Sequence, residues 1–259
     1  MKLLMRWTLA LGVLTILSCN KDQQKDSEVA FDSVVGQFAD IKVLRYQIPG
    51  FEDLTLKEQK LVYYLTQAGL EGRDIMWAQN YRHNLVIRKA LESVYQQYQG
   101  DRNTEQWLAF DTYLKRVWFS NGIHHHYSNA KIMPDFTQDY LVQLLKDTET
   151  ELSGEALDVI FNDLDAKKVD LSKDADIVLS SAINMYGPEV TTADVESFYG
   201  QVEVDADEPI EIGLNTRLVK ENGVIIEQVY KSGGLYGDAI DRIIFWLEKA
   251  YGVAENQNQ

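Results

Sequence analysis

Apolar residues recur every three to four positions along much of this chain, and this spacing is typical of amphipathic helices. Two of the predicted helices begin with a clear start signal, because Thr55 is followed by Glu58 and Thr191 by Asp194. Gly69 weakens the longest of them near its middle, as does a second glycine three residues later. The pattern predicts helices over 28–41, 55–79, 81–98, 104–119, 137–146, 155–164, 191–199 and 236–251.

The clearest strand signal lies near the end of the chain. Segments 214–220 and 224–230 flank an Asn222-Gly223 pair, and Asn-Gly is the strongest two-residue hairpin turn. The remaining segments read as loops: an extended connection over 44–51, a polar loop over 120–134, a solvated linker over 163–176 and an acidic loop over 205–209. We therefore expect an α+β fold, mainly helical, with a small β-sheet or an incomplete β-barrel.

The first nineteen residues have the pattern of a bacterial lipoprotein signal. Lys2 and Arg6 precede an apolar run of about 11 residues, which is too short for a membrane span of roughly 20. Ile16-Leu17-Ser18-Cys19 then gives the order of a lipobox, and Cys19 is the only cysteine of the chain. An ordinary signal peptide with an incidental cysteine is the alternative. We expect a signal over 1–19 with lipidation at Cys19, a flexible tether over 20–28, one lobe over 29–252 and a polar stub over 253–259.

The charge balance limits the partners. The formal net charge is −15, and both nucleic acids and anionic lipid surfaces require basic patches. We therefore expect no nucleic-acid partner, and membrane contact only through the lipid anchor of a protein in the bacterial cell envelope.

Histidines 124 to 126 are the most distinctive candidate residues, because the chain has only four histidines. Three readings stay open: a metal site, a binding cleft, or structural hydrogen bonding. Adjacent side chains point in different directions, and no histidine is followed by a glutamate, so these residues alone are a poor metal site. No Gly-x-Ser-x-Gly elbow, phosphate loop or dinucleotide fingerprint is present. We assign no catalytic and no metal residues, and take Asn121, His124, His125, His126 and Tyr127 as a candidate cleft loop.

Several segments resemble the N-terminal part of the dipeptidyl peptidase III family, in particular its bacterial members. The resemblance runs from about Phe38 to Asn256. The segments are 38–46, 49–51, 61–65, 72–75, 113–127 and 213–220, of which Trp118-Phe119-Ser120-Asn121-Gly122-Ile123-His124-His125-His126-Tyr127 is the most specific. The resemblance implies a two-lobed zinc peptidase that removes dipeptides from peptide N-termini. Its lower lobe holds a five-stranded β-barrel, and its helical upper lobe binds zinc through a His-Glu-x-x-Gly-His helix and a later glutamate.

This chain departs from the family at that motif, because it contains no His-Glu-x-x-Gly-His. No catalytic residue can be carried over, and zinc is expected in the full-length family but not in this chain. We expect a truncated or split member that corresponds to the lower lobe and is inactive alone, with peptides or a separately encoded upper lobe as partners. The alternative is a non-catalytic peptide-binding lipoprotein.

Overall fold

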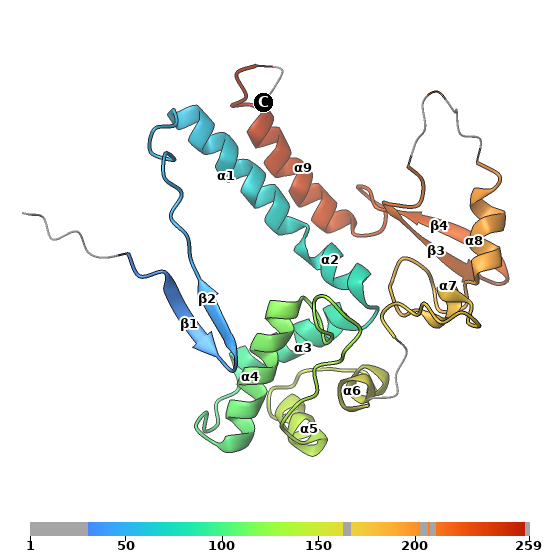
Figure 1. Ribbon diagram of the computed structural model, residues 1–259, viewed down its shortest axis with the longest axis horizontal. Helices are drawn as coiled ribbons and strands as arrows, with labels where there is room; N and C mark the ends of the chain where they lie inside the picture. Colours follow the sequence, from blue (N-terminus) through green and yellow to red (C-terminus); the bar gives the residue numbers. More distant parts are fainter. Residues whose placement is uncertain (1–30, 163–166, 203–206, 208–210, 257–259) are drawn as a thin grey trace, which may run out of the picture.

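The computed structural model describes residues 31–162, 167–202, 207 and 211–256. Figure 1 shows a helical core that carries three peripheral pieces: a hairpin near the N-terminus, a long pair of helices, and a second hairpin with two short helices beside it. The helices are α1 Leu56–Glu71, α2 Arg73–Asn80, α3 Asn84–Gln97, α4 Glu105–Ser120, α5 Gln138–Asp147, α6 Gly154–Phe161, α7 Ile177–Ser180, α8 Thr192–Tyr199 and α9 Gly237–Tyr251. The strands are β1 Val34–Phe38, β2 Ile41–Leu44, β3 Thr216–Glu221 and β4 Val224–Val229.

Side-chain caps set where many of the helices begin. The predicted capping boxes of Thr55 with Glu58 and of Thr191 with Asp194 are both confirmed. Thr104 and Thr137 accept hydrogen bonds from backbone N–H groups at the starts of α4 and α5, and Ser153 does so for α6. Because such a cap satisfies a backbone donor that the helix leaves free, these starts are determined locally.

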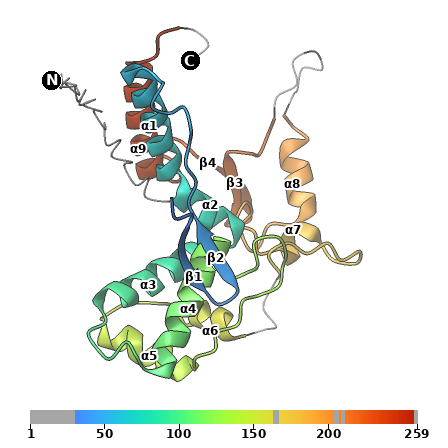
Figure 2. The ribbon, with the colours of Figure 1, turned by 60° about the vertical axis from the view of Figure 1, so that its left-hand side comes forward.

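The predicted helix over 55–79 is interrupted. Gly72 ends α1 and directly precedes α2, and it makes no side-chain cap at the start of α2. Glycine is a poor helix former because it loses more backbone entropy than other residues. The break turns α2 away from α1, so α1 projects from the core while α2 packs on α3 (Figure 2).

The predicted helix over 28–41 is wrong, since residues 34–44 form an antiparallel hairpin. Phe38 pairs with Ile41, which leaves Ala39 and Asp40 as a two-residue turn, and Ala39 has a positive φ of 48°. The segment contains β-branched Val34 and Val35, which favour strands. The spacing of its apolar residues fits a helix as well as a strand. Pairing with β2 favours the strand, and the spacing of apolar residues gives no information on such pairing.

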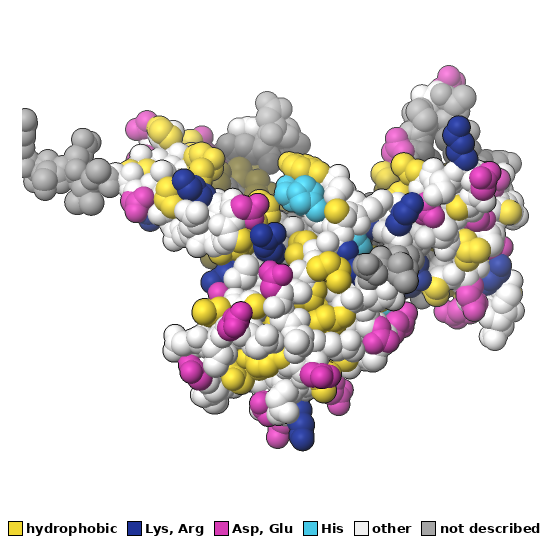
Figure 3. All heavy atoms as spheres, turned by 60° about the horizontal axis from the view of Figure 1, so that its bottom comes forward, with side chains coloured by type: hydrophobic (Ala, Val, Ile, Leu, Met, Phe, Trp, Pro, Cys, Tyr) yellow, Lys and Arg dark blue, Asp and Glu magenta, His cyan; other side chains and the backbone are white. Residues whose placement is uncertain are grey.

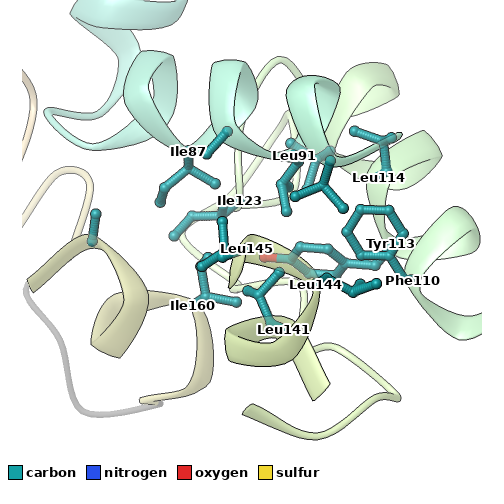
Figure 4. Close-up of a cluster of buried hydrophobic side chains, with 14 of the residues drawn as sticks. Ile87, Leu91, Phe110, Tyr113, Leu114, Ile123, Leu141, Leu144, Leu145 and Ile160 are labelled. Atoms are coloured by element: carbon teal, nitrogen blue, oxygen red, sulfur yellow. The ribbon is translucent and has the colours of Figure 1, made fainter. Parts of the chain in front are cut away.

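The main hydrophobic core lies among α2 to α6. Figure 4 shows inward side chains of α3 to α6, together with Ile123 from the loop after α4, meeting in one cluster, which Trp77 of α2 also joins. Leu91, Phe110, Leu114 and Leu141 are fully buried there. Three aromatic residues of α4 also belong to this core, namely Trp107, Phe110 and Tyr113.

Helices α1 and α9 lie side by side and run antiparallel (Figures 1 and 2). Lys57 pairs with Glu255 at one end of the pair, and Glu71 with Arg242 at 2.7 Å at the other. Between them Tyr64 stacks on Trp246 with ring centroids 6.0 Å apart. Within the two helices only small residues are fully buried, namely Ala68, Ala239 and Ala250. Many larger apolar side chains of the two helices are exposed, among them Tyr63, Leu65 and Phe245.

The predicted Asn222-Gly223 hairpin is confirmed as β3 paired with β4. Both turn residues have positive φ, 52° and 81°, as a type I′ turn requires. Asp194 of α8 accepts a hydrogen bond from Lys220 of β3 at 2.8 Å, and this bond with the capping bonds of Thr191 lowers the pKa of Asp194 to about 2. Helix α8 is thereby attached to the hairpin.

The α+β class is confirmed, but the sheets are small. In the described part of the chain, β1–β2 and β3–β4 are two separate two-stranded sheets. The described part of the predicted linker, 167–176, is more structured than expected, because Lys167 and Lys168 accept backbone hydrogen bonds from Ala182 and Ile183. The short helix α7 was not predicted.

Several predictions lie outside the described residues. They are the signal, Cys19, the tether over 20–28, most of the acidic loop over 205–209 and the last residues of the C-terminal stub. Among the helices that are described, none has the length and apolar character needed to cross a membrane.

Candidate functional site

The candidate cleft loop begins where α4 ends. Asn121 caps the helix in the left-handed conformation, with φ 53°, and Gly122 follows with φ 155°. Asn84, which is buried at the start of α3, holds this turn: its Oδ1 accepts the Ile123 N–H at 3.1 Å and its Nδ2 donates to the Asn121 carbonyl at 3.3 Å. A Cβ on Gly122 would lie 2.2 Å from Asn84 Nδ2, so only glycine fits.

His124 belongs to the core side of this loop. Its side chain is 3% exposed and packs edge-on against Tyr81, with ring centroids 4.7 Å apart. A backbone bridge to Lys131 fixes its position. Burial and the ring contact favour a structural role for His124, and the prediction that 120–134 is a polar loop is wrong for the buried residues Ile123 and His124.

His125, His126 and Tyr127 lie on the surface. The two imidazoles stack with centroids 4.4 Å apart, and His126 also contacts Tyr127 at 4.2 Å. The ring of Phe119, from the last turn of α4, meets His126 edge-on at 5.2 Å. Tyr127 is 88% exposed. These four residues form an exposed cluster, here called the aromatic cluster, and Figure 3 shows exposed imidazoles next to hydrophobic side chains.

An apolar groove of about 470 Å³ adjoins the aromatic cluster. One wall is the β1–β2 hairpin and the other is the last turns of α4, and Phe119 belongs to both the groove and the cluster. Arg116 of α4 pairs with Asp40 in the hairpin turn at 3.0 Å and holds the walls together. The groove is lined by Val35, Gly36, Gln37, Phe38, Val43, Lys115, Trp118 and Phe119.

A second, polar cavity of about 460 Å³ lies on the other side of Trp118, and Asn121 contributes to its wall. Arg88 donates to Asp74 at 2.6 Å, and Trp118 donates to Glu92 at 2.8 Å. Burial alone would raise the pKa of Asp74, but the hydrogen bond and the charge of Arg88 hold it below its ordinary value. Because these polar groups already bond to one another, we interpret them as a structural network that lines the cavity.

The loop does not form a metal site. His124 faces the core, whereas His125 and His126 stack on the surface, so the three imidazoles do not converge on one point. Within the described residues, no three His, Cys, Asp or Glu side chains are placed to hold a metal ion. The zinc centre that the family resemblance implies therefore has no fit among these side chains.

The sequence contains a signal for the loop but none for the groove. One wall of the groove is the β1–β2 hairpin, part of which the sequence pattern predicts to be a helix. Val43 of the hairpin and Lys115 of α4 come together only through tertiary packing. Helical spacing predicts a core position for Trp118, yet Trp118 and its neighbour Phe119 are both more than a third exposed. The sequence signal for this region is the run from Trp118 to Tyr127, which places six aromatic or imidazole side chains within ten residues.

Comparison with known proteins gives no assignment. No protein-family model matches this chain, and no curated protein matches it significantly.

Proposed function

We propose that this chain is a peptide-binding lobe of the dipeptidyl peptidase III type, and that the apolar groove between β1–β2 and α4 holds an extended peptide. The observation that carries the proposal is the groove itself, which has apolar side chains on both walls and the aromatic cluster at one end. Apolar clefts with few polar groups are the usual sites of small ligands and peptides.

The hairpin adds a second kind of recognition. Within the described residues, β1 and β2 pair only with each other, so each strand has an outer edge whose backbone groups are unpaired. An extended peptide adds to such an edge through main-chain hydrogen bonds, while its alternate side chains enter the adjoining groove. The peptide sequence is then read mainly as apolar residues at every second position.

The position of the groove supports the family reading. Five of its eight lining residues lie in segments 38–46 and 113–127, which are among the blocks that resemble the family. The exposed apolar face of α1 and α9, with Tyr63, Leu65 and Phe245, is typical of a surface on which another protein element packs. Because the zinc motif is absent from the sequence, hydrolysis requires a zinc-bearing upper lobe. Lipidation at Cys19 would place this function in the cell envelope.

Peptide binding is tested by calorimetry with an acetylated and amidated pentapeptide of alternating Val and Thr around a central Phe. We expect saturable binding, and Val43→Asp should weaken it by about tenfold or more, because the groove then buries an unpaired carboxylate. Leu44→Asp is the matched control, since Leu44 follows Val43 on the same strand, is similarly exposed (46% against 40%) and does not line the groove. Equal binding by both variants would contradict the proposal.

Catalysis is tested with a dipeptidyl arylamide in the presence of zinc chloride. The purified chain alone should release no dipeptide, and addition of an upper lobe from a family member should restore release. Stoichiometric zinc binding with dipeptide release by the chain alone would refute the proposal that hydrolysis requires a zinc-bearing upper lobe. Peptide binding without any gain from an added upper lobe would favour the alternative, a non-catalytic peptide-binding lipoprotein.

A further inference from the structure

A third cavity, of about 500 Å³, lies between the helical core and the β3–β4 hairpin. Arg82, in the connection between α2 and α3, and Arg217 of β3 both line it. The remaining wall is mostly apolar, with Leu85 and Val86 from α3 and Leu235 from the loop before α9. None of its lining residues belongs to the apolar groove or the aromatic cluster.

Backbone hydrogen bonds fix the two arginines in place. The Arg82 N–H donates to the Ala182 carbonyl at 3.1 Å, and the Asn184 N–H donates to the Gln79 carbonyl at 2.9 Å. The same segment continues to β3, where the Leu218 N–H donates to the Met185 carbonyl at 3.1 Å. Residues 182–187 therefore connect the chain around Arg82 to the strand that carries Arg217.

The charges of these arginines are not balanced by the described residues. Arg217 is half-buried, its Nε is enclosed without a hydrogen-bond acceptor, and no carboxylate of the described residues lies within ion-pair distance of its guanidinium. Arg82 donates to the Ser181 carbonyl at 2.9 Å and forms no close ion pair with the described residues either. Burial lowers the pKa of Arg82, and the like charge of Arg217 lowers it further, against Tyr81 and Glu155, which raise it.

Two half-buried guanidinium groups facing one cavity are unfavourable unless an anion joins them, since burial of an unpaired charge is costly. Such an arrangement is unusual in a chain with 40 acidic and 25 basic residues, where carboxylate partners are plentiful. Glu151 and Lys89 also line the cavity, but both are exposed, and Lys89 is paired with Asp74 at 3.4 Å.

We propose that this cavity binds a small organic carboxylate, with Arg82 and Arg217 holding its oxygens. The planar guanidinium fork matches a carboxylate in two parallel hydrogen bonds. The apolar wall suits the aliphatic remainder of an amino acid or of a peptide C-terminus. Burial and the neighbouring Tyr230 raise the pKa of Tyr236 to about 12, so this hydroxyl on the cavity wall keeps its proton and can donate to the ligand.

The overall field of the protein favours a singly charged carboxylate over phosphate. The net charge of −15 repels a doubly charged anion more strongly than a singly charged one. A bare phosphate would also leave the apolar wall without a contact. The inference goes beyond the proposed function, because it concerns a separate cavity and stands whether or not a peptide binds in the groove.

The test is calorimetry of the purified full chain with N-acetyl-alanyl-alanine, its C-terminal amide, and inorganic phosphate. We expect saturable binding of the free acid only. Arg217→Met should weaken it by about tenfold or more, because one charged hydrogen-bonding partner is lost. Arg242→Met is the matched control, since Arg242 is already paired with Glu71 and lies outside the cavity, and it should bind the free acid like the wild type.

A thermal melt without ligand separates a binding role from a structural one. If Arg217 serves a ligand, Arg217→Met should melt at the same temperature as the wild type or higher, because an uncompensated charge is removed. A lower melting temperature of this variant in the absence of ligand would assign Arg217 to the fold and overturn the proposal. Unchanged binding in Arg217→Met, tighter binding of phosphate than of the free acid, or equal binding of the amide would also overturn it.

Discussion

At the residue scale, Asn84 determines the shape of the candidate loop. It lies 37 residues before Asn121 in the sequence, and its amide contacts the backbone on both sides of Gly122. A buried amide of this kind acts as a backbone substitute, because it satisfies a donor and an acceptor that the turn leaves unpaired. His124 and the exposed residues His125, His126 and Tyr127 come directly after this turn, so we expect their positions to depend on Asn84.

Replacement of Asn84 by leucine should therefore destabilise the protein by about 2 kcal/mol, since the buried Ile123 N–H loses its acceptor while the volume is nearly kept. Urea unfolding followed by circular dichroism measures the change. Asn103→Leu is the control, because Asn103 is exposed and should change the unfolding free energy by less than about 0.5 kcal/mol. Similar effects of the two variants would show that the turn does not depend on Asn84.

At the element scale, turn chemistry separates the two hairpins. The β3–β4 turn has the Asn-Gly pair that favours positive φ at both positions, and it was predicted from the sequence. The β1–β2 turn uses Ala39-Asp40, which carries no such signal. Its apolar residues were therefore read with helical spacing, and the groove wall that they form was missed.

Two glycine-to-alanine substitutions test backbone conformation without a packing change, because an added Cβ meets no atom within 4 Å at Gly69 or Gly223. Gly69 lies inside α1, and Gly69→Ala should stabilise the protein by about 0.5–1 kcal/mol. Gly223 has φ 81°, so Gly223→Ala should destabilise it by about 1 kcal/mol. Denaturant midpoints measure both changes, and an equal sign for the two variants would contradict this account.

At the scale of the whole molecule, stability is concentrated in one region. The cluster among α2 to α6 contains most of the fully buried large side chains of the described residues, whereas β1 and β2 bury none fully. The α1–α9 pair is held by ring contacts and terminal ion pairs. Regions with few buried apolar contacts open at lower free energy than a packed core.

A matched pair of leucine substitutions measures this difference. Leu91→Ala, in the core at 0% exposure, should lower the unfolding free energy by about 3 kcal/mol. Leu65→Ala, on α1 at 47% exposure, should lower it by less than about 0.5 kcal/mol. Hydrogen exchange should show stronger protection of α3 and α4 than of α1 and α9. Uniform protection would mean that the peripheral pieces are as stable as the core.

The features that the sequence by itself determined are those governed by neighbouring residues. The capped starts of α1 and α8 and the Asn222-Gly223 turn depend on side-chain to backbone hydrogen bonds and φ preferences within a few positions. The α+β class follows from the same signals. The lipoprotein signal and the family resemblance also come from the sequence and remain predictions.

Tertiary structure alone decided the rest. The β1–β2 hairpin needs the pairing of two strands, and the burial of His124 needs Tyr81. Residues 182–187 bring Arg82 and Arg217, which are 135 positions apart in the sequence, to the same cavity. These contacts have no local signature, because the same side-chain pattern is compatible with several partners until the core has packed. Both candidate binding sites of this protein, the apolar groove and the arginine cavity, are of this kind.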